Sequence, residues 1–379
     1  MTSAAIPLLA SIAVLASAGA NASETLDATR ARASEDGALL WYDARLLGIE
    51  GHGWTEMESP YDRLPARARQ KVRPEVWALS RHSAGLCVRF ETDARSIHAA
   101  WTLTSPRLEM PHMPATGVSG VDLYVRTDRG GWHWLATGRP TAQTNTARLV
   151  TGLPEGRRQY LMYLPLYNGV ASLEIGIPKE NLLARAAPRP ASHQHPIVFY
   201  GTSITQGGCA SRPGMVHTAI LGRWFDRPVI NLGFSGNGRM ELELAELMAE
   251  LDAALFVIDC LPNITAREVT ERTGPLVKSL RQAHPTTPIL LVEDRSYADA
   301  FLIPGRRQRN ESSRAALRQD YEKLKAGGVD GLYYLEGHGL LGEDGEDTVD
   351  GSHPTDLGFL RQAEAFRAVL EPLLGAQTK

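Results

Sequence analysis

The hydrophobic pattern of the sequence changes its period at a stretch rich in proline and alanine, residues 186–196. Before this stretch, apolar and polar residues alternate in short runs, separated by turns such as Asp-Arg-Gly-Gly at 128–131. After it, short apolar runs alternate with longer segments that have a helical spacing of apolar residues. The first pattern is typical of half-buried strands, and the second is typical of a parallel sheet covered by helices. The sequence therefore predicts two domains of different class, and 379 residues are enough for two cores.

The first predicted domain, residues 37–185, is an all-β sandwich of the jelly-roll type. Its alternating runs are rich in β-branched and aromatic residues, and glycine-rich turns separate them, as in antiparallel sheets that pack face to face. Aromatic side chains here could stack on sugar rings, although alternating strand positions favour the core for most of them. The candidates are Trp41, Trp54, Trp132 and Trp134.

The second predicted domain, residues 196–379, is a doubly wound α/β domain with helices on both faces of a parallel sheet. In such a sheet ligands bind beyond the carboxyl ends of the strands, so the residues that follow each strand are the first candidates for a site. The predicted strands are residues 197–200, 229–232, 255–258, 289–292 and 332–335, and the clearest helices are residues 239–251, 267–283, 311–326 and 355–374.

Glycine and polar residues follow the first three of these strands. Ser203 stands at a strand-to-helix turn, where its hydroxyl can be exposed and its N–H can face an oxyanion. Gly236 lies in a glycine-rich loop whose backbone can approach a bound group closely. Asn263 offers a side-chain amide donor, although it could instead cap the helix that follows. These positions suit a nucleophile and donors for a negatively charged intermediate.

An acid and a base for this serine lie on one loop before the last helix. The spacing Asp-x-x-His lets the carboxylate of Asp350 orient one side of the His353 ring while the other nitrogen faces the serine, which is otherwise a weak nucleophile. His217 and His338 are alternative bases; His217 falls in a predicted helix, where packing is its other role. Ser203 lacks the Gly-x-Ser-x-Gly pattern of the α/β-hydrolase nucleophile elbow, which excludes that fold.

Four short motifs resemble, in order, the sequence blocks of SGNH (GDSL-like) hydrolases. The resemblance implies that Ser203 is the nucleophile and that Asp350 and His353 complete a catalytic triad. It also implies an oxyanion hole made by Ser203, Gly236 and Asn263. The motifs are Gly-Thr-Ser-Ile at 201–204, Asn-Leu-Gly-Phe-Ser-Gly-Asn at 231–237, Leu-Pro-Asn at 261–263 and Asp-Gly-Ser-His-Pro-Thr-Asp at 350–356.

Two further features bear on the same resemblance. Thr202 stands where the name-giving Gly-Asp-Ser-Leu motif has aspartate, a departure that affects local geometry only. Gly-Val-Asp-Leu-Tyr at 120–124 resembles the GxDLY β-domain that precedes some SGNH hydrolases. Several two-domain SGNH enzymes of this plan are carbohydrate esterases, so the resemblance implies a serine esterase that removes O-acetyl groups, with a small ester or an acetylated carbohydrate as substrate.

Alternatives to this function stay open. A lipolytic or thioester hydrolase of longer acyl chains would carry the same triad, and an inactive carbohydrate-binding protein would keep the fold without turnover. No metal or organic cofactor is implied by a Ser-His-Asp mechanism. The formal charge of −3, with acids and bases mixed along the chain, leaves no broad basic face for nucleic acid.

The N-terminus and the cysteines bear on location. Residues 1–22 have an apolar run followed by Ala-Asn-Ala, which is typical of a signal peptide and too short and interrupted for a stable membrane span. We therefore expect a secreted or periplasmic protein that begins at Ser23. Three cysteines exclude a disulfide-built scaffold, while a bridge between Cys209 and Cys260 and buried free thiols are both open.

Overall fold

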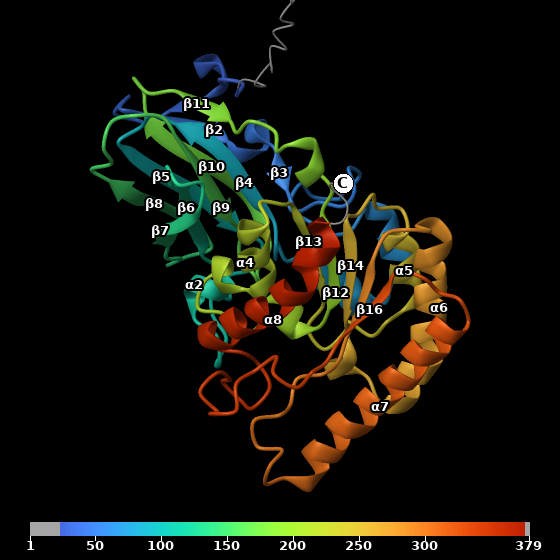
Figure 1. The fold of residues 1–379 in the computed structure, drawn as a ribbon. Coiled ribbons are helices and arrows are strands. Elements are labelled where there is room, and N and C mark those ends of the chain that lie inside the picture. The colour runs from blue at the N-terminus through green and yellow to red at the C-terminus, as the bar shows by residue number, and fades with distance from the viewer. Residues whose placement is uncertain (1–22, 376–379) are drawn as a thin grey trace, which may run out of the picture.

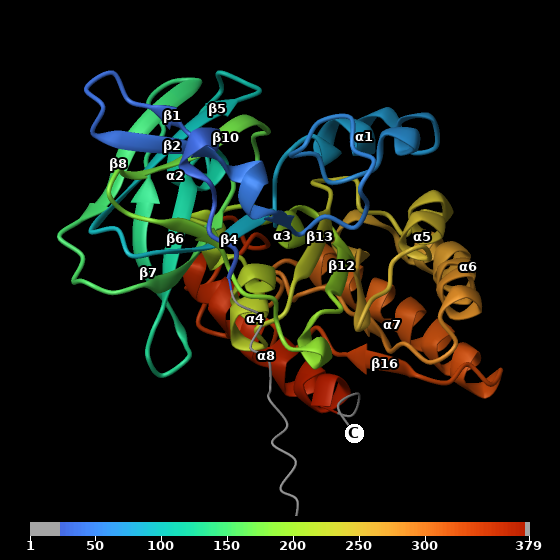
Figure 2. The same cartoon turned by 90° about the horizontal axis from the view of Figure 1, so that it is seen from above.

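The computed structural model describes residues 23–375, so the predicted signal peptide lies outside the described residues. An antiparallel β domain lies beside an α/β domain, as Figure 1 shows from the side and Figure 2 from above. Within the described residues no helix has both the length and the apolarity needed to cross a bilayer. The fold class predicted from the two hydrophobic periods is confirmed.

Two antiparallel sheets form the β domain. The strands are β1 Arg32–Ala33, β2 Leu39–Asp43, β3 Ile49–Glu50, β4 Cys87–Thr92, β5 Ser96–Leu103, β6 Val121–Arg126, β7 Trp132–Gly138, β8 Thr144–Thr151, β9 Arg158–Tyr163, β10 Val170–Pro178 and β11 Leu183–Arg185. One sheet has the order β1-β2-β10-β5-β8 and the other β11-β4-β9-β6-β7, with β3 paired to β4. Their facing sides share one core, to which Phe90, Trp101 and Leu123 belong.

The α/β domain is built on one parallel sheet in the order β13-β12-β14-β15-β16. Its strands are β12 Ile197–Gly201, β13 Val229–Gly233, β14 Leu255–Asp259, β15 Ile289–Val292 and β16 Leu332–Leu335, and its helices are α3 Ser203–Gln206, α4 His217–Trp224, α5 Leu242–Met248, α6 Ala266–Ala283, α7 Pro304–Ala326 and α8 Asp356–Gly375. The chain winds outward from β12 in both directions, which makes the carboxyl ends of β12 and β14 the topological switch point. These ends point toward the bottom of Figure 1.

Helices cover both faces of this sheet because successive strand residues point to opposite sides. Ile197 and Phe199 pack with residues of α4 and α8, whereas Val198 and Tyr200 pack with residues of α5, α6 and α7. Helix α7 begins at Pro304, seven positions before the predicted start at residue 311. Proline in the first helical turn suits the fixed backbone angle and the missing N–H of that position.

Residues 51–84, between β3 and β4, form no strand and pack against the α/β domain. They include α1, Pro74–Ser80, which lies beside α5 in Figures 1 and 2. Trp54 belongs to the core on that side of the parallel sheet. The guanidinium of Arg63 is buried and donates to the carbonyls of Asn231 and Gly233, at 3.0 and 2.7 Å. This segment therefore holds the end of β13 from outside the α/β domain.

The Gly-x-Asp-Leu-Tyr motif lies at the joint between the two domains. The buried carboxylate of Asp122 accepts from Nη1 of Arg212 at 2.7 Å and from the N–H of Gly214 at 2.9 Å. The hydroxyl of Tyr124 accepts from the same Arg212 nitrogen at 2.5 Å. Because Arg212 and Gly214 follow the predicted nucleophile closely in sequence, the motif ties the β domain to the segment that leaves the candidate site.

The four tryptophans and three cysteines can now be placed. Trp41 and Trp54 are buried, Trp132 is half-buried, and Trp134 is 52% exposed. The core expectation therefore fits Trp41 and Trp54 and does not fit Trp134. All three cysteines are buried free thiols, so the bridge considered between Cys209 and Cys260 is absent.

Candidate active site

Ser203 is the first residue of α3 and lies directly beyond β12, at the switch point of the sheet. Thr202 is the N-cap of this short helix, and its hydroxyl accepts from the N–H of Ile204 at 3.3 Å. The turn is tight, because a Cβ on Gly201 would lie 2.0 Å from the hydroxyl of Thr205. Threonine in place of aspartate thus still caps the helix that presents Ser203.

The structure brings Ser203, His353 and Asp350 into one hydrogen-bonded chain. Oγ of Ser203 lies 2.8 Å from Nε2 of His353, and Nδ1 of His353 lies 2.7 Å from Oδ2 of Asp350. The other carboxylate oxygen of Asp350 accepts from the N–H groups of Ser352 and His353, at 3.0 and 2.8 Å. A hydroxyl bonded to an imidazole that a carboxylate orients is the arrangement that nucleophilic acyl transfer requires.

The protonation of Asp350 follows from these contacts. Partial burial acts to raise the pKa of its carboxyl, but hydrogen bonds from the backbone and ring of His353 and from the N–H of Ser352 outweigh it, and the net pKa is lowered. Asp350 is therefore a carboxylate at neutral pH, able to accept from the imidazole.

Gly236 lies in the loop after β13 with a positive φ of +68°, a conformation that favours glycine. A Cβ built on it would meet no atom within 4 Å, so open space lies before its backbone. Within residues 23–375 neither its N–H nor that of Ser203 has a hydrogen-bond partner. Both N–H groups are thus available to an oxyanion.

Asn263 ends the short turn η6, Leu261–Asn263, after β14. The N-cap of α6 is Thr265, which forms a capping box with Glu268, so the alternative role of Asn263 as helix cap is wrong. When its carboxamide oxygen faces the loop after β13, it accepts from the N–H groups of Asn237 and Gly238, at 3.0 and 3.2 Å. This orientation leaves its Nδ2 protons for another acceptor.

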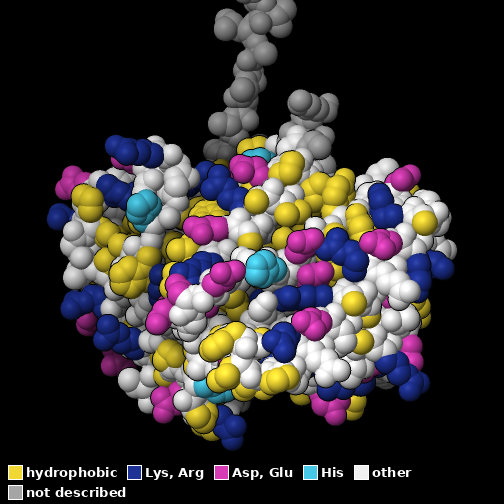
Figure 3. Space-filling view, turned by 60° about the horizontal axis from the view of Figure 1, so that its bottom comes forward, with side chains coloured by type: hydrophobic (Ala, Val, Ile, Leu, Met, Phe, Trp, Pro, Cys, Tyr) yellow, Lys and Arg dark blue, Asp and Glu magenta, His cyan; other side chains and the backbone are white. Residues whose placement is uncertain are grey.

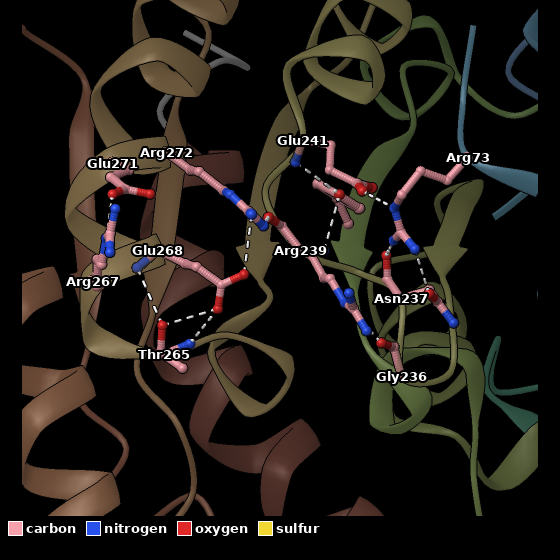
Figure 4. A network of polar contacts seen from close by, with 11 residues as sticks. Arg73, Gly236, Asn237, Arg239, Glu241, Thr265, Arg267, Glu268, Glu271 and Arg272 are labelled. Carbon is pink, nitrogen blue, oxygen red and sulfur yellow. Dashed lines mark hydrogen bonds and ion pairs between the residues drawn. The ribbon is translucent and has the colours of Figure 1, made fainter. Parts of the chain in front are cut away.

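A polar network braces the loop that carries Gly236 (Figure 4). Arg73, at the start of α1, donates to the side chain and the carbonyl of Asn237 at 2.7 and 3.1 Å and also pairs with Glu241. Nε of Arg239 donates to the carbonyl of Gly236 at 3.0 Å. The loop is thus held from two sides, by its own chain and by the segment that interrupts the β domain.

The network continues to the start of α6. Nη1 of Arg272 donates to the carbonyl of Arg239 at 2.9 Å, and Nη2 of Arg272 lies 3.0 Å from Glu268, the partner of Thr265 in the capping box. The same hydrogen-bonded set therefore connects the loop of Gly236 with the first turn of the helix that follows Asn263.

A buried ion pair between Asp259 and Arg295 contacts α3 through Thr205. Asp259, at the end of β14, accepts from Nη2 of Arg295 at 2.8 Å and from the hydroxyl of Thr205 at 3.3 Å. Burial raises the pKa of Asp259, and the guanidinium of Arg295 opposes that rise. Both side chains are shielded from solvent, so the pair fixes the turn that carries Ser203 against the neighbouring strand.

Two residues of the β domain also reach the site, and the sequence analysis did not single them out. The hydroxyl of Tyr167 donates to the carbonyl of Ser203 at 3.2 Å. The ring of His112 lies 6.2 Å, centre to centre, from the ring of His353. Both residues lie on loops far upstream in sequence, and no local spacing connects them with the nucleophile.

The alternative bases lie elsewhere. His217 is fully buried and stacks on Phe359 and Phe366, and burial, with a further effect of Arg295, lowers its pKa well below the usual value. It is a neutral packing residue. His338 is exposed and faces Glu343 at 3.5 Å. Neither contacts Ser203.

A cavity of about 430 Å³ opens beside the loop of Asp350 and His353 and is lined by residues such as Tyr297, Phe301, His338 and Leu341. Ser203, Asp350 and His353 do not line it. Figure 3 shows the face at the bottom of Figure 1, where hydrophobic, acidic, basic and histidine side chains are interspersed. Among residues 23–375, no group of three or more His, Cys, Asp or Glu side chains could hold a metal ion.

Comparisons with known proteins match both domains. The model of the GDSL-like lipase/acylhydrolase family matches residues 194–371, and the model of the N-terminus of SGNH-hydrolase-type esterases, GxDLY, matches residues 39–183. The structure of a protein from Bacteroides ovatus ATCC 8483, described as a GDSL-like lipase, is 35% identical with a TM-score of 0.84, and the match covers 89% of this chain and 98% of that one. Among curated proteins, none matches.

Two more distant structures share the fold alone. A salicylyl-acyltransferase from a tetracycline biosynthetic pathway is 18% identical with a TM-score of 0.70, covering 91% of this chain and 97% of that one. A family two carbohydrate esterase from Clostridium thermocellum, in complex with cellohexaose, is 17% identical with a TM-score of 0.54, covering 77% and 93%. Both family models and the identity to the Bacteroides protein over most of both chains lead to one assignment: the chain belongs to the GDSL-like lipase/acylhydrolase family of hydrolases.

Proposed function

We propose that the protein is a secreted serine esterase that removes O-acetyl groups from carbohydrate, with Ser203, His353 and Asp350 as its catalytic triad. The observation that carries the proposal is the chain of two short hydrogen bonds from Asp350 through His353 to Ser203, 2.7 and 2.8 Å long. In this arrangement Nε2 of His353 can accept the hydroxyl proton of Ser203, and Asp350 holds the imidazole of His353 in one tautomer.

In the acylation step, Oγ of Ser203 attacks the ester carbon while Nε2 of His353 takes its proton. The carbonyl oxygen becomes an oxyanion, which the free N–H groups of Ser203 and Gly236 and the Nδ2 group of Asn263 stabilise. The C–O bond to the alcohol then breaks, and His353 returns the proton to the departing oxygen. The products of this step are the free alcohol and an acyl group on Ser203.

In the deacylation step, water attacks the acyl carbon and His353 accepts a proton from it. The same donors stabilise the second oxyanion, the bond to Oγ of Ser203 breaks, and the serine regains its proton from His353. The net reaction consumes one water and releases one carboxylic acid. Asp350 stays ionised throughout and stabilises the imidazolium that forms in each step.

Three features support an acetylated carbohydrate as the substrate and a location outside the cytoplasm. The two-domain fold is shared with a carbohydrate esterase whose structure contains cellohexaose. Tyr167 and His112 of the β domain lie beside Ser203 and His353, so this domain borders the proposed site. Residues 1–22 have the features of a signal peptide.

Acetate release tests this function directly. Purified protein is incubated with acetylated xylan, acetylated mannan and acetylated bacterial polysaccharides, and free acetate is measured against the Ser203→Ala variant. Release from at least one polymer, absent in the variant, would support the proposal. Hydrolysis of aryl acetates without release from any polymer would limit the protein to small esters, and no turnover at all would favour an inactive binding protein.

One observation favours a second candidate, a lipolytic hydrolase of longer acyl chains. Phe301, Leu302 and Ile303 are consecutive and exposed, by 81%, 73% and 41%. Their loop is tied to the triad loop, because the N–H of Ala298 donates to the carbonyl of Gly351 at 2.9 Å. An aryl ester series from acetate to decanoate separates the two: an acetylesterase loses activity beyond propionate, whereas a lipolytic enzyme gains it.

A further inference from the structure

His112 lies at the tip of a turn that the β domain extends over the candidate site. Met110 and Met113 exchange backbone hydrogen bonds of 3.0 and 3.1 Å, so Pro111 and His112 form the tip between them. The His112 ring is exposed, and its centre lies 6.2 Å from that of His353. Among residues 23–375, no hydrogen-bond or ion-pair partner is found for its ring nitrogens.

The turn is anchored to the segment that follows the nucleophile. Met113 is 2% exposed and packs in a cluster that also contains Ile204 and Ala210. Gly117 approaches this segment so closely that a Cβ on it would lie 2.2 Å from the carbonyl oxygen of Ala210. The hydroxyl of Thr116 donates to the carbonyl of Ser211 at 2.6 Å. The residues that follow His112 therefore pack on the segment that follows Ser203, and this packing holds the turn of His112 in place.

The chemistry of the proposed triad tells which part of an ester this residue would meet. In ester hydrolysis the carbonyl oxygen points to the oxyanion donors, here the loop of Gly236 and Asn263. The alcohol oxygen must lie near Nε2 of His353, because that nitrogen protonates it as it leaves. His112 lies beside His353 and on a different element from the oxyanion donors. We therefore expect it to border the alcohol portion of the ester.

We propose that His112 is a specificity-determining residue that hydrogen-bonds the alcohol portion of the ester and selects alcohols with additional hydroxyl groups. This inference rests on the proposed function and deepens it. A neutral imidazole carries one donor and one acceptor, and a sugar hydroxyl can satisfy either. The α/β domain then selects the acyl group, and the β domain selects the alcohol.

The test compares two acetates of primary alcohols that differ in their hydroxyl groups, 6-O-acetylglucose and ethyl acetate. For the wild-type protein we expect a higher kcat/KM on the sugar ester. The His112→Ala variant should lose about tenfold of kcat/KM on 6-O-acetylglucose, the cost of roughly one hydrogen bond, and less than about threefold on ethyl acetate. His112→Gln keeps a donor and an acceptor and should recover part of the preference.

The matched control is His133→Ala, which removes another exposed histidine of the β domain, on β7. It should leave both rates unchanged. Equal losses on both esters in His112→Ala, no loss on either, or a wild-type protein without preference for the sugar ester would each overturn the assignment of His112. Failure of the proposed function would look different. The Ser203→Ala protein would then be as active as the wild-type protein on each ester, or neither protein would hydrolyse either ester.

Discussion

The proposed nucleophile side of the site, around Ser203, and the proposed acid–base loop, which carries Asp350 and His353, differ in how they are held. Ser203 is 9% exposed and lies among turns in which glycines leave no room for a side chain, such as Gly201. The side chains of His353 and Asp350 are 26% and 44% exposed and bond to each other across three positions of one loop. Contacts distant in sequence fix the first side, whereas the bonds between Asp350 and His353 are local.

Substitutions on the two sides should therefore act in different ways. Contacts from Arg73, Tyr167 and the buried pair of Asp259 and Arg295 position the nucleophile side, so changes there act through geometry. The side chains of His353 and Asp350 are partly exposed, so changes there should alter the proton transfer and leave the fold intact.

Ser203→Ala removes the proposed nucleophile. We expect kcat/KM on p-nitrophenyl acetate to fall by roughly 10⁴- to 10⁶-fold, as in serine-protease triads, with an unchanged thermal unfolding midpoint because only one hydroxyl is lost. The control is Ser352→Ala, beside His353, whose backbone N–H to Asp350 is kept. Near-full turnover in folded Ser203→Ala protein would require another serine.

Asp350→Asn removes the carboxylate of the proposed acid–base loop and leaves the contacts of Ser203 on the proposed nucleophile side unchanged. Activity should fall by roughly 10²- to 10⁴-fold, because the imidazole loses the partner that fixes its tautomer. Ser203 should still react slowly with a phosphonate probe, followed by intact mass. Asp344→Asn is the control, since it removes the ion pair with Arg361 from the same loop and leaves His353 untouched. Equal losses of activity in both variants would mean that activity depends on the conformation of the loop and not on the carboxylate of Asp350.

Asn263→Ala removes one oxyanion donor from the nucleophile side. We expect a loss of roughly 10²- to 10³-fold in kcat on p-nitrophenyl acetate with little change in KM, because an oxyanion exists only near the transition state. Asn263→Asp, similar in shape but without the amide donor, should cost at least as much. A change in KM alone would contradict the role as oxyanion donor.

Arg73→Ala tests the brace from outside the α/β domain. Loss of its bonds to Asn237 should let the Gly236 loop relax and lower kcat/KM by about tenfold, the cost of roughly one hydrogen bond. Arg73→Lys should restore little, since an ammonium lacks the planar fork that reaches both acceptors and Glu241. Arg69→Ala, which breaks an exposed pair with Glu58, is the control. Unchanged activity in Arg73→Ala would show that the Gly236 loop keeps its conformation without the bonds from Arg73.

The same division explains what the sequence could predict. The Asp350 and His353 contact was predictable because it spans three positions. The place of Ser203, Gly236 and Asn263 at one edge of the sheet was predictable because each follows a strand of one parallel sheet. Arg73, Tyr167 and His112 were missed because only the tertiary fold brings them to the site. Residues 51–84 fall inside the predicted β domain, and no periodic pattern in the sequence indicates that they pack on the α/β domain.

The proposed function requires that His353 activates Ser203 and no other serine. Treatment with a fluorophosphonate, followed by peptide mass analysis over the time course of inactivation, tests it most directly. We predict a single adduct on the peptide that contains Ser203, formed in parallel with the loss of esterase activity and slowed in Asp350→Asn. Complete inactivation with the adduct on another residue, or a Ser203 adduct with activity retained, would contradict the account.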